Sequence, residues 1–337
     1  MDGVLNALML LGNFVIVPGM AYGAQLALGA LGVTLVYGVL RFSNFAHGET
    51  MSFGAMAAIL VMWALQAAQI SIAPAPTILL ALPAAILVTV AMLLLTDRAV
   101  YRFYRRQKAK PVVLLIVSTG VMFVMAGLVR FVIGPDNQIA ADGARFLIRA
   151  REMRELTGLD QGIAIRASQV ISILAAAACV AALFWFLNRT RDGKAMRAFS
   201  DNEDLALLSG VNPERVVAIA WILTAALATL AGALYALDKT YTPFVFQQLL
   251  LPVFAAAIVG GLGNPLGAVA GGFLIAFSEV VVTYAYKRVL IYASSGALEP
   301  EGLVQLLSTE YKFAVSFIIL VIVLLVRPTG MFRGKAL

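Results

Sequence analysis

The chain has 337 residues, of which 61% are hydrophobic and 13% charged, and its mean hydropathy is +0.92. An ordinary soluble domain is about half apolar and about a quarter charged, so this composition excludes that class and indicates a membrane protein. The net charge of +7 does not point to nucleic acid, because the basic residues gather at the ends of apolar runs. One cysteine and one histidine exclude an intrachain disulfide and a His/Cys metal cluster, and no cofactor is expected.

Apolar runs predict the membrane-crossing helices, each of which takes about 20 residues. The run from Val4 to Leu40 is too long for one crossing, and Pro18-Gly19 interrupts it, which predicts a short helix over 4–17 and a span over 20–40. The fold class is therefore all-α: a polytopic membrane protein with about eight or nine transmembrane helices, some broken by glycine or proline. Further spans are predicted at residues 51–68, 77–96, 112–133, 169–187, 216–237, 248–259, 266–286 and 313–326.

The segment Arg41-Phe-Ser-Asn-Phe-Ala-His-Gly-Glu49 joins the first two spans and holds the only histidine. Ionisable groups inside a membrane protein often mark a solute path, so Asn44, His47 and Glu49 are candidate path residues. The alternative is that the segment lies at the surface. There, a lone histidine is more often a structural hydrogen-bonding residue than a ligand or a base.

The distribution of charge predicts the orientation of the chain. Loop 98–110 carries six basic residues and no acidic one, which predicts a cytoplasmic location. Alternation of the spans then puts segment 188–215 and the C-terminal tail on the same side. The same alternation puts loop 134–168 on the external side of the membrane. Its five arginines weaken the rule that basic residues gather on the cytoplasmic side, but five acidic residues accompany them, so a folded external loop is predicted.

The cytoplasmic insert between two spans contains a predicted short helix near 201–209. Ser200-Asp-Asn-Glu203 has the form of a capping box, and Gly210 follows the last apolar turn. Leu205 and Leu208 lie on one face of this helix, and a membrane protein can offer such a helix to a soluble partner. A solvated charged loop is the alternative, and the capping pattern favours the docking helix.

The stretch 257–272 is the richest in glycine. Gly260-Gly261 and Asn264-Pro265 suggest an interruption between two helical pieces, and Pro252 stands nearby. At membrane depth such a break must be buried in protein or line a watery cavity. Glycines four residues apart allow close helix packing instead, so both interpretations stay open. The candidate path residues in this stretch are Gly260, Gly261 and Gly263, and the four-residue repeat continues at Gly267 and Gly271.

Glu279 is the one acidic residue inside a predicted span. It could face the solute path or form a hydrogen bond to a neighbouring helix, and the second interpretation is favoured. The chain has no G-x-x-x-x-G-K-[ST] motif, since its Gly-Lys pairs at 193–194 and 334–335 lack the flanking residues. Any ATP must therefore be hydrolysed by another chain, and the protein itself is not expected to be an enzyme.

Several motifs together match one family. The chain resembles, over nearly its whole length, the LivH-type permease subunit of bacterial branched-chain amino acid ABC transporters. The Asn-Phe-Ala-His-Gly-Glu sequence is specific to this group, whereas the glycine repeat alone would be a weak match. The matching stretches are Leu35–Glu49, Gly193-Lys-Ala-Met-Arg-Ala198, Ala257–Gly263 with Gly267, Leu307–Lys312 and Arg327–Gly330.

The resemblance implies a multi-pass subunit of the bacterial inner membrane, folded as one permease domain over 1–337, that imports branched-chain amino acids. It implies four kinds of contact: a second, LivM-like permease subunit, two ABC ATPase subunits, a periplasmic solute-binding protein and membrane lipid, with no nucleic acid. Such permeases carry a coupling segment with a Glu-Ala-Ala-x-x-x-Gly core, of which Asp204-Leu-Ala-x-x-x-Gly210 is a degenerate form. The implied coupling residues are Gly193, Arg197, Asp204, Leu205, Ala206 and Gly210.

Three other functions are considered. The same permease architecture could carry urea, short amides or other amino acids, because the binding protein usually sets specificity. An ion-coupled secondary transporter would show paired intramembrane carboxylates or repeated halves with matching broken helices, and the sequence has neither. A membrane-embedded enzyme needs a convergent nucleophile, base and stabilising donors, and a single histidine argues against that.

Overall fold

The computed structural model describes residues 2–294, 297–327 and 329–332. These residues are mostly helical, and within them nine helical segments are long and apolar enough to cross a membrane. The predicted class, an all-α polytopic membrane protein, is confirmed. The nine segments are Asp2–Leu40, His47–Ala67, Ile78–Arg106, Pro111–Ile133, Ala167–Arg189, Pro213–Lys239, Pro243–Gly260, Pro265–Thr283 and Thr309–Val326.

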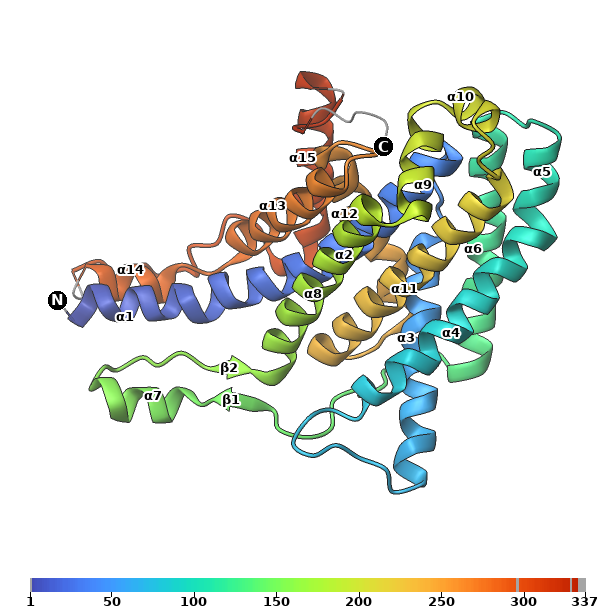
Figure 1. Ribbon diagram of the computed structural model, residues 1–337. Helices are drawn as coiled ribbons and strands as arrows, with labels where there is room; N and C mark the ends of the chain where they lie inside the picture. Colours follow the sequence, from blue (N-terminus) through green and yellow to red (C-terminus); the bar gives the residue numbers. More distant parts are fainter. Residues whose placement is uncertain (1, 295–296, 328, 333–337) are drawn as a thin grey trace.

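The first segment is one continuous helix, drawn as the long blue ribbon in Figure 1. α1 (Asp2–Leu11) passes through a π-helical turn (Gly12–Ile16) into α2 (Val17–Leu40). The predicted division at Pro18-Gly19 is wrong. Pro18 lies in the first turn of α2, and the wider π turn before it accommodates a residue that has no N–H and a bulky ring.

The remaining membrane helices follow the predicted spans closely. Four of those that begin earlier than predicted start on a proline, which suits the first helical position. Pro252 lies inside α12 without ending it. The helices are α3 (His47–Ala67), α4 (Ile78–Thr96), α6 (Pro111–Ile133), α8 (Ala167–Arg189), α11 (Pro213–Lys239), α12 (Pro243–Gly260), α13 (Pro265–Thr283) and α15 (Lys312–Val326).

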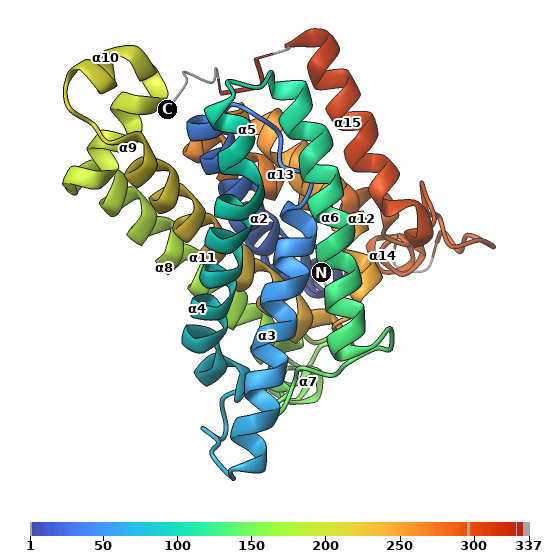
Figure 2. The same ribbon diagram turned by 90° about the vertical axis from the view of Figure 1, so that its right-hand side faces the viewer.

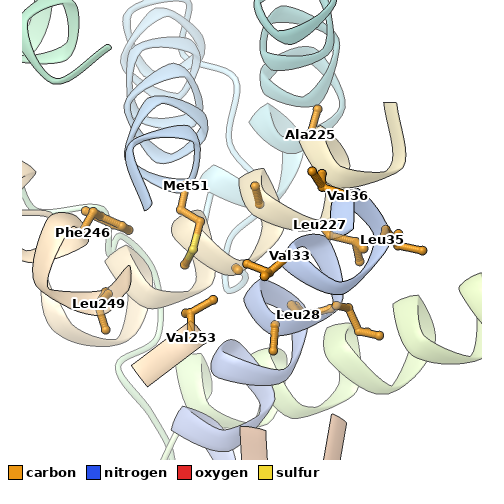
Figure 3. Packing of buried hydrophobic residues seen from close by; sticks show 14 of the residues in the cluster. Leu28, Val33, Leu35, Val36, Met51, Ala225, Leu227, Phe246, Leu249 and Val253 are labelled. Atoms are coloured by element: carbon orange, nitrogen blue, oxygen red, sulfur yellow. The ribbon is translucent and has the colours of Figure 1, made fainter. Parts of the chain in front are cut away.

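α2 is the central helix of the bundle and packs against α8, α11, α12 and α13. Figure 3 shows Leu28 and Val33 of α2 close to Met51 of α3 and Val253 of α12. Small residues allow this density: a Cβ added to Gly232 of α11 would lie 2.1 Å from the Met51 carbonyl oxygen. The helices on the outside of the bundle, several of them in front in Figure 2, expose apolar side chains as lipid-facing helices do.

Connecting segments mark two opposite ends of the bundle. At one, α5 (Arg102–Arg106) meets the start of α11 through an ion pair of 3.1 Å between Arg102 Nε and Glu214 Oε1. We call this the basic end, and it confirms that 98–110 and 188–215 lie on the same side. At the other, the loop end, the connection after α6 forms β1 (Phe146–Ile148), α7 (Ala150–Thr157) and β2 (Ile165–Arg166).

The connection at the loop end is folded, as predicted. The backbone N–H of Gln161 donates to Asn6 Oδ1 at 2.9 Å, which attaches the connection to α1. Asp142 accepts hydrogen bonds from the Thr77 N–H and the Gln66 side-chain amide, both at 2.7 Å. α14 (Lys287–Ala293) lies along α1 (Figure 1). The N-terminal helix therefore supports two separate segments of the loop end.

Candidate functional site

Two short helices protrude at the basic end: α9 (Arg191–Asp201) and α10 (Glu203–Leu208) (Figure 1). The predicted capping box from Ser200 to Glu203 is wrong, because Ser200 lies inside α9. Asn202 is the N-cap of α10, and its side-chain oxygen accepts the Leu205 N–H at 3.0 Å. The insert therefore forms two helices joined at Asn202.

α10 ends where the sequence predicts. Gly210 has a φ of +82°, which a side chain would make unfavourable. The N–H of Val211 donates to the Ala206 carbonyl and that of Gly210 to the Leu207 carbonyl, both at 3.0 Å. This pair of bonds is a Schellman motif, and it satisfies carbonyl groups at the end of the helix.

The outer face of α10 is apolar and exposed. The exposed fraction is 61% for Leu205 and 85% for Leu208, whereas Ala206 on the opposite face keeps only 3%. Exposed leucines on a helix that protrudes from the bundle are a surface that a partner can cover. A hollow of about 530 Å³ adjoins α10 and is lined by Arg102 and Asp204 among others.

Gly193 and Arg197 attach α9 to the end of α8. A Cβ on Gly193 would lie 2.2 Å from the Phe186 carbonyl oxygen, so only glycine fits this close approach. Arg197 Nη1 donates to Asn188 Oδ1 at 3.1 Å. Both residues fix the position of the insert, and their role in coupling stays a prediction.

The insert also makes a direct contact with α2. Ser200 Oγ donates to the Gly38 carbonyl oxygen at 2.6 Å, and the Arg41 guanidinium donates to the Ser200 carbonyl oxygen. Arg41 is the C-cap of α2, with a φ of +56°. No periodicity in the sequence predicts this contact, because its two partners are 162 residues apart.

A second connection at the basic end is made by Asp97, which the sequence analysis did not single out. Its carboxylate pairs with Arg105 and accepts the Trp221 indole N–H at 2.7 Å. Trp221 stacks on Tyr101, whose hydroxyl donates to Asn44 Oδ1 at 3.1 Å. The only available sequence signal was an acidic residue directly after an apolar run and eight residues before an arginine.

The segment between α2 and α3 is buried, so the alternative of a surface location is wrong. Asn44 is 3% exposed and His47 is fully buried. The Phe45 N–H donates to Ser118 Oγ of α6 at 3.1 Å, and Asn44 Oδ1 accepts the Ala46 N–H. This is irregular backbone inside the bundle, a feature that membrane proteins tolerate only where protein or a cavity surrounds it.

Several polar atoms along α2, α3 and α11 are buried without a hydrogen-bond partner among the described protein residues. A buried polar atom without a partner is costly and therefore calls for an explanation. The unpartnered atoms include both ring nitrogens of His47, Glu49 Oε1, Gln25 Oε1, Thr34 Oγ1 and Thr229 Oγ1. The His47 ring packs directly on Gly32, where an added Cβ would lie 2.6 Å from the ring.

The glycine-rich stretch is a tight helix crossing followed by a turn. A Cβ on Gly260 would lie 2.0 Å from the Gly267 carbonyl oxygen, so α12 and α13 touch backbone to backbone. Gly261 and Gly263 have φ values of +110° and +82° in the turn between the helices. The predicted interruption is real, but it lies at the helix ends, where Met331 N–H donates to the Val259 carbonyl.

Glu279 lies near the loop-end terminus of α13 and is 1% exposed. The Ser316 hydroxyl of α15 donates to Glu279 Oε1, which confirms the predicted hydrogen bond to a neighbouring helix. Lys239, the last residue of α11, places its ammonium 4.4 Å from the centroid of the Tyr22 ring. Lys312 approaches the same ring, at 5.9 Å.

The sequence profile of the family described as branched-chain amino acid transport system / permease component matches residues 15–324. The chain belongs to this family. Curated relatives include the high-affinity branched-chain amino acid transport system permease proteins LivH of Salmonella typhimurium and LivH of Escherichia coli K12, each 29% identical to this permease. Each alignment covers 93% of this chain and 92% of the relative. The corresponding BraD protein of Pseudomonas aeruginosa is 28% identical over 94% of both chains.

Among solved structures, PsaBC from Streptococcus pneumoniae in complex with Fab aligns over 99% of this permease and 94% of that chain, with a TM-score of 0.46 and 11% identity. The predicted residues fall into four separate places in the permease, one of which is the junction of α12 and α13 that holds Gly260, Gly261 and Gly263. The coupling candidates lie together at the basic end, the three candidates of 44–49 are buried beside α2, and Glu279 lies near the loop end. Within the part of the chain that the structure describes, no group of three His, Cys, Asp or Glu side chains could hold a metal ion.

Proposed function

We propose that the protein is the membrane-spanning permease subunit of an ATP-driven importer, and that it passes branched-chain amino acids from a periplasmic binding protein into the cytoplasm. Family membership and nine membrane-crossing segments among the described residues support this role. The relatives named above are permeases for these amino acids. The whole chain, 1–337, acts as one permease domain in the bacterial inner membrane.

The basic end faces the cytoplasm in this proposal, because the six basic residues of 98–110 lie there. Two ABC ATPase subunits bind outside the membrane at this end, one of them on α10 of this chain. The second permease is a LivM-like subunit beside this one. The binding protein docks at the opposite end, on the folded connection that carries β1, α7 and β2.

The observation that carries the proposal is the combination of exposed leucines on α10 with the bond from Ser200 to α2. A partner that covers Leu205 and Leu208 pushes on α10, and the contact between Ser200 and Gly38 transmits that movement to the central helix. ATP shifts the equilibrium between two conformations only if the ATPase subunits bind one of them more tightly. Asp204, Gly193 and Arg197 position this surface.

The test is co-purification of the ATPase subunits from detergent-solubilised membranes, together with ATP-dependent leucine uptake into proteoliposomes. Leu208→Asp puts a charge on the docking face, and we expect loss of about 2 kcal/mol of binding, roughly thirtyfold. For the recovery of ATPase subunits alone, Leu156→Asp is the matched control, because Leu156 of α7 is 84% exposed at the opposite end, away from the ATPase docking face. Normal ATPase recovery with Leu208→Asp would contradict the docking assignment, and uptake without ATP would contradict the importer.

A further inference from the structure

Four helices come together toward the loop end of the bundle to form a group of charged and polar residues that the proposed function does not use. We call it the lysine–tyrosine cluster. α2, α11, α13 and α15 contribute its members (Figure 1), so residues 290 positions apart, Tyr22 and Lys312, meet here. The cluster consists of Tyr22, Tyr235, Lys239, Glu279, Lys312 and Ser316.

Two ammonium groups share one aromatic ring in the cluster. Lys239 Nζ lies 4.4 Å from the centroid of Tyr22 and 5.5 Å from that of Tyr235. Lys312 Nζ lies 5.9 Å from the Tyr22 centroid. Among the described residues, neither ammonium has a carboxylate oxygen within the 4.0 Å of an ion pair. Two like charges are therefore held close together without a paired anion.

The two carboxylate oxygens of Glu279 have different surroundings. Glu279 Oε1 accepts the Ser316 hydroxyl, while Glu279 Oε2 and the Tyr22 hydroxyl are buried without a hydrogen-bond partner. The exposed fractions are 1% for Glu279 and 3% for Tyr22. Asp238, next to Lys239 in the chain, accepts a hydrogen bond from the Ser168 hydroxyl at 3.0 Å. A phenol hydroxyl and a carboxylate oxygen therefore lie buried close to each other and to the two ammonium groups.

Both lysines keep solvent-exposed surface at the loop end. Lys239 is exposed and Lys312 is partly exposed, although protein surrounds Lys239 on most sides. A hollow of about 450 Å³ adjoins the last turn of α11; Ala236, Asp238, Thr240 and Arg166 line it, and neither lysine does. A volume of this size admits a small organic molecule.

We propose that Lys239 and Lys312 bind the carboxylate of the transported solute, which makes the permease selective for amino acids over urea and short amides. This inference rests on the proposed import function. Charged hydrogen bonds from two ammonium groups suit a carboxylate. The rings of Tyr22 and Tyr235 offer apolar surface to a branched side chain and a π-face to an ammonium group, and Glu279 Oε2 can accept from that ammonium.

The first experiment measures how fast each lysine reacts with an amine-directed acetylating reagent. The full-length permease is reconstituted in zwitterionic phosphatidylcholine nanodiscs, and modification of each lysine is read by mass spectrometry. The two probes are isocaproate and isocaproamide, which share one branched skeleton and differ only in the carboxylate. We expect isocaproate to slow the reaction of Lys239 and Lys312 at least severalfold and isocaproamide to leave it unchanged. Lys287 of α14, at the same end, is the internal control.

Three results would overturn the inference. One is equal protection by the acid and the amide, and another is protection of Lys287 along with the two cluster lysines. The third is protection that appears only when phosphatidylglycerol is added to the nanodiscs, which would assign the cluster to an anionic lipid headgroup. Each result is obtained without ATP or partner subunits, so none depends on the importer assignment.

The second experiment measures leucine uptake by the complete reconstituted transporter. Lys239→Gln and Lys312→Gln should each lower the uptake rate at saturating loaded binding protein by about tenfold, since a charge-assisted contact is lost. Lys239→Arg and Lys312→Arg, which keep the charge, should retain most of the rate, and Lys287→Gln should match the wild type. No leucine uptake by the wild-type assembly would defeat the proposed function. Wild-type uptake with unchanged Lys→Gln variants would defeat this inference alone.

Discussion

Ser200 and Gly38 join the insert at the basic end to the central helix through one buried hydrogen bond of 2.6 Å. The partner carbonyl belongs to the last turn of α2, and Arg41 holds the same serine from its other side. α2 also carries Tyr22, sixteen residues before Gly38. That separation is roughly 24 Å along a helix, so one rigid element connects the docking helices with the lysine–tyrosine cluster.

Ser200→Ala should weaken coupling without preventing assembly. The change leaves the Gly38 carbonyl without its partner, and a hydrogen bond of this kind contributes about 1 kcal/mol, or roughly a fivefold shift in an equilibrium. We expect ATP hydrolysis to continue while the leucine imported per ATP falls severalfold, measured in proteoliposomes. Ser209→Ala is the control, because the Ser209 hydroxyl bonds only within its own exposed helix turn. An unchanged ratio of leucine to ATP would contradict transmission through this bond.

Gly210→Ala should loosen the end of α10. A side chain at a φ of +82° costs about 1 kcal/mol, so the Schellman motif opens part of the time and the leucine face loses its fixed shape. The measurement is recovery of ATPase subunits, which we expect to fall severalfold. Gly127→Ala in α6 is the control, since nothing lies within 4 Å of the added Cβ. Equal recovery for both variants would remove Gly210 from the docking surface.

Ala206 illustrates where sequence reasoning about α10 was incomplete. A bulky charged substitution at Ala206 looks like a clean test of coupling from the motif alone. The residue is 3% exposed, however, so such a side chain would disturb the packing of α10 and could not separate coupling from folding. Leu208 is the better position, because the helix presents it to the outside.

Patterns along the chain predicted the features of the fold that depend only on neighbouring residues. The length of an apolar run located the membrane spans, and Gly210, which takes up a positive φ, located the end of α10. The buried location of segment 42–46 and the contact between Ser200 and Gly38 were not predictable in this way. They depend on which helices lie side by side, and hydropathy is nearly the same on every side of α2.

The glycine stretch was ambiguous for a related reason. A break at membrane depth and a tight crossing use the same residues, and only the position of Gly267 relative to Gly260 decides between them. The lysine–tyrosine cluster was missed because its two lysines lie at span ends, where basic residues are expected for orientation alone.

Lowering the pH should detach the connection around Asp142 from Gln66 and Thr77, its hydrogen-bond partners. Partial burial raises the pKa of this carboxyl, and the hydrogen bonds from Thr77 and Gln66 more than offset that effect, so the pKa lies below its usual range. A lowered pKa contributes stability above the unfolded-state pKa, and this contribution is lost as the pH falls through the folded-state pKa. Proteolysis within 134–144 should therefore accelerate only at strongly acidic pH. In Asp142→Asn it should be fast at neutral pH and vary less with acidification.

Gly260→Ala should disrupt the crossing of α12 and α13. The added Cβ would lie 2.0 Å from a backbone oxygen, which cannot move without shifting a whole helix. We expect a destabilisation of about 3 kcal/mol or more, seen as a lowered thermal midpoint in detergent and poor recovery of folded protein. Gly120→Ala in α6, where the added Cβ meets nothing within 4 Å, should be neutral or slightly stabilising. Normal stability of Gly260→Ala would mean that the two helices can separate.

His47 and Gly32 form the contact that sets where α3 begins beside α2. A Cβ on Gly32 would lie 2.6 Å from the imidazole ring, so Gly32→Ala should push the ring aside and lower the thermal midpoint by several degrees, for a cost of about 1–3 kcal/mol. His47→Ala alone should also destabilise, because it leaves a cavity and removes packing on α2.

In the double variant the added methyl group enters the space that the ring has left. The two effects should therefore be less than additive, with a coupling of about 1 kcal/mol in the double-mutant cycle. Strict additivity would mean that the two residues do not share this contact, and the buried segment 42–46 would have to be held by Ser118 and Tyr101 alone.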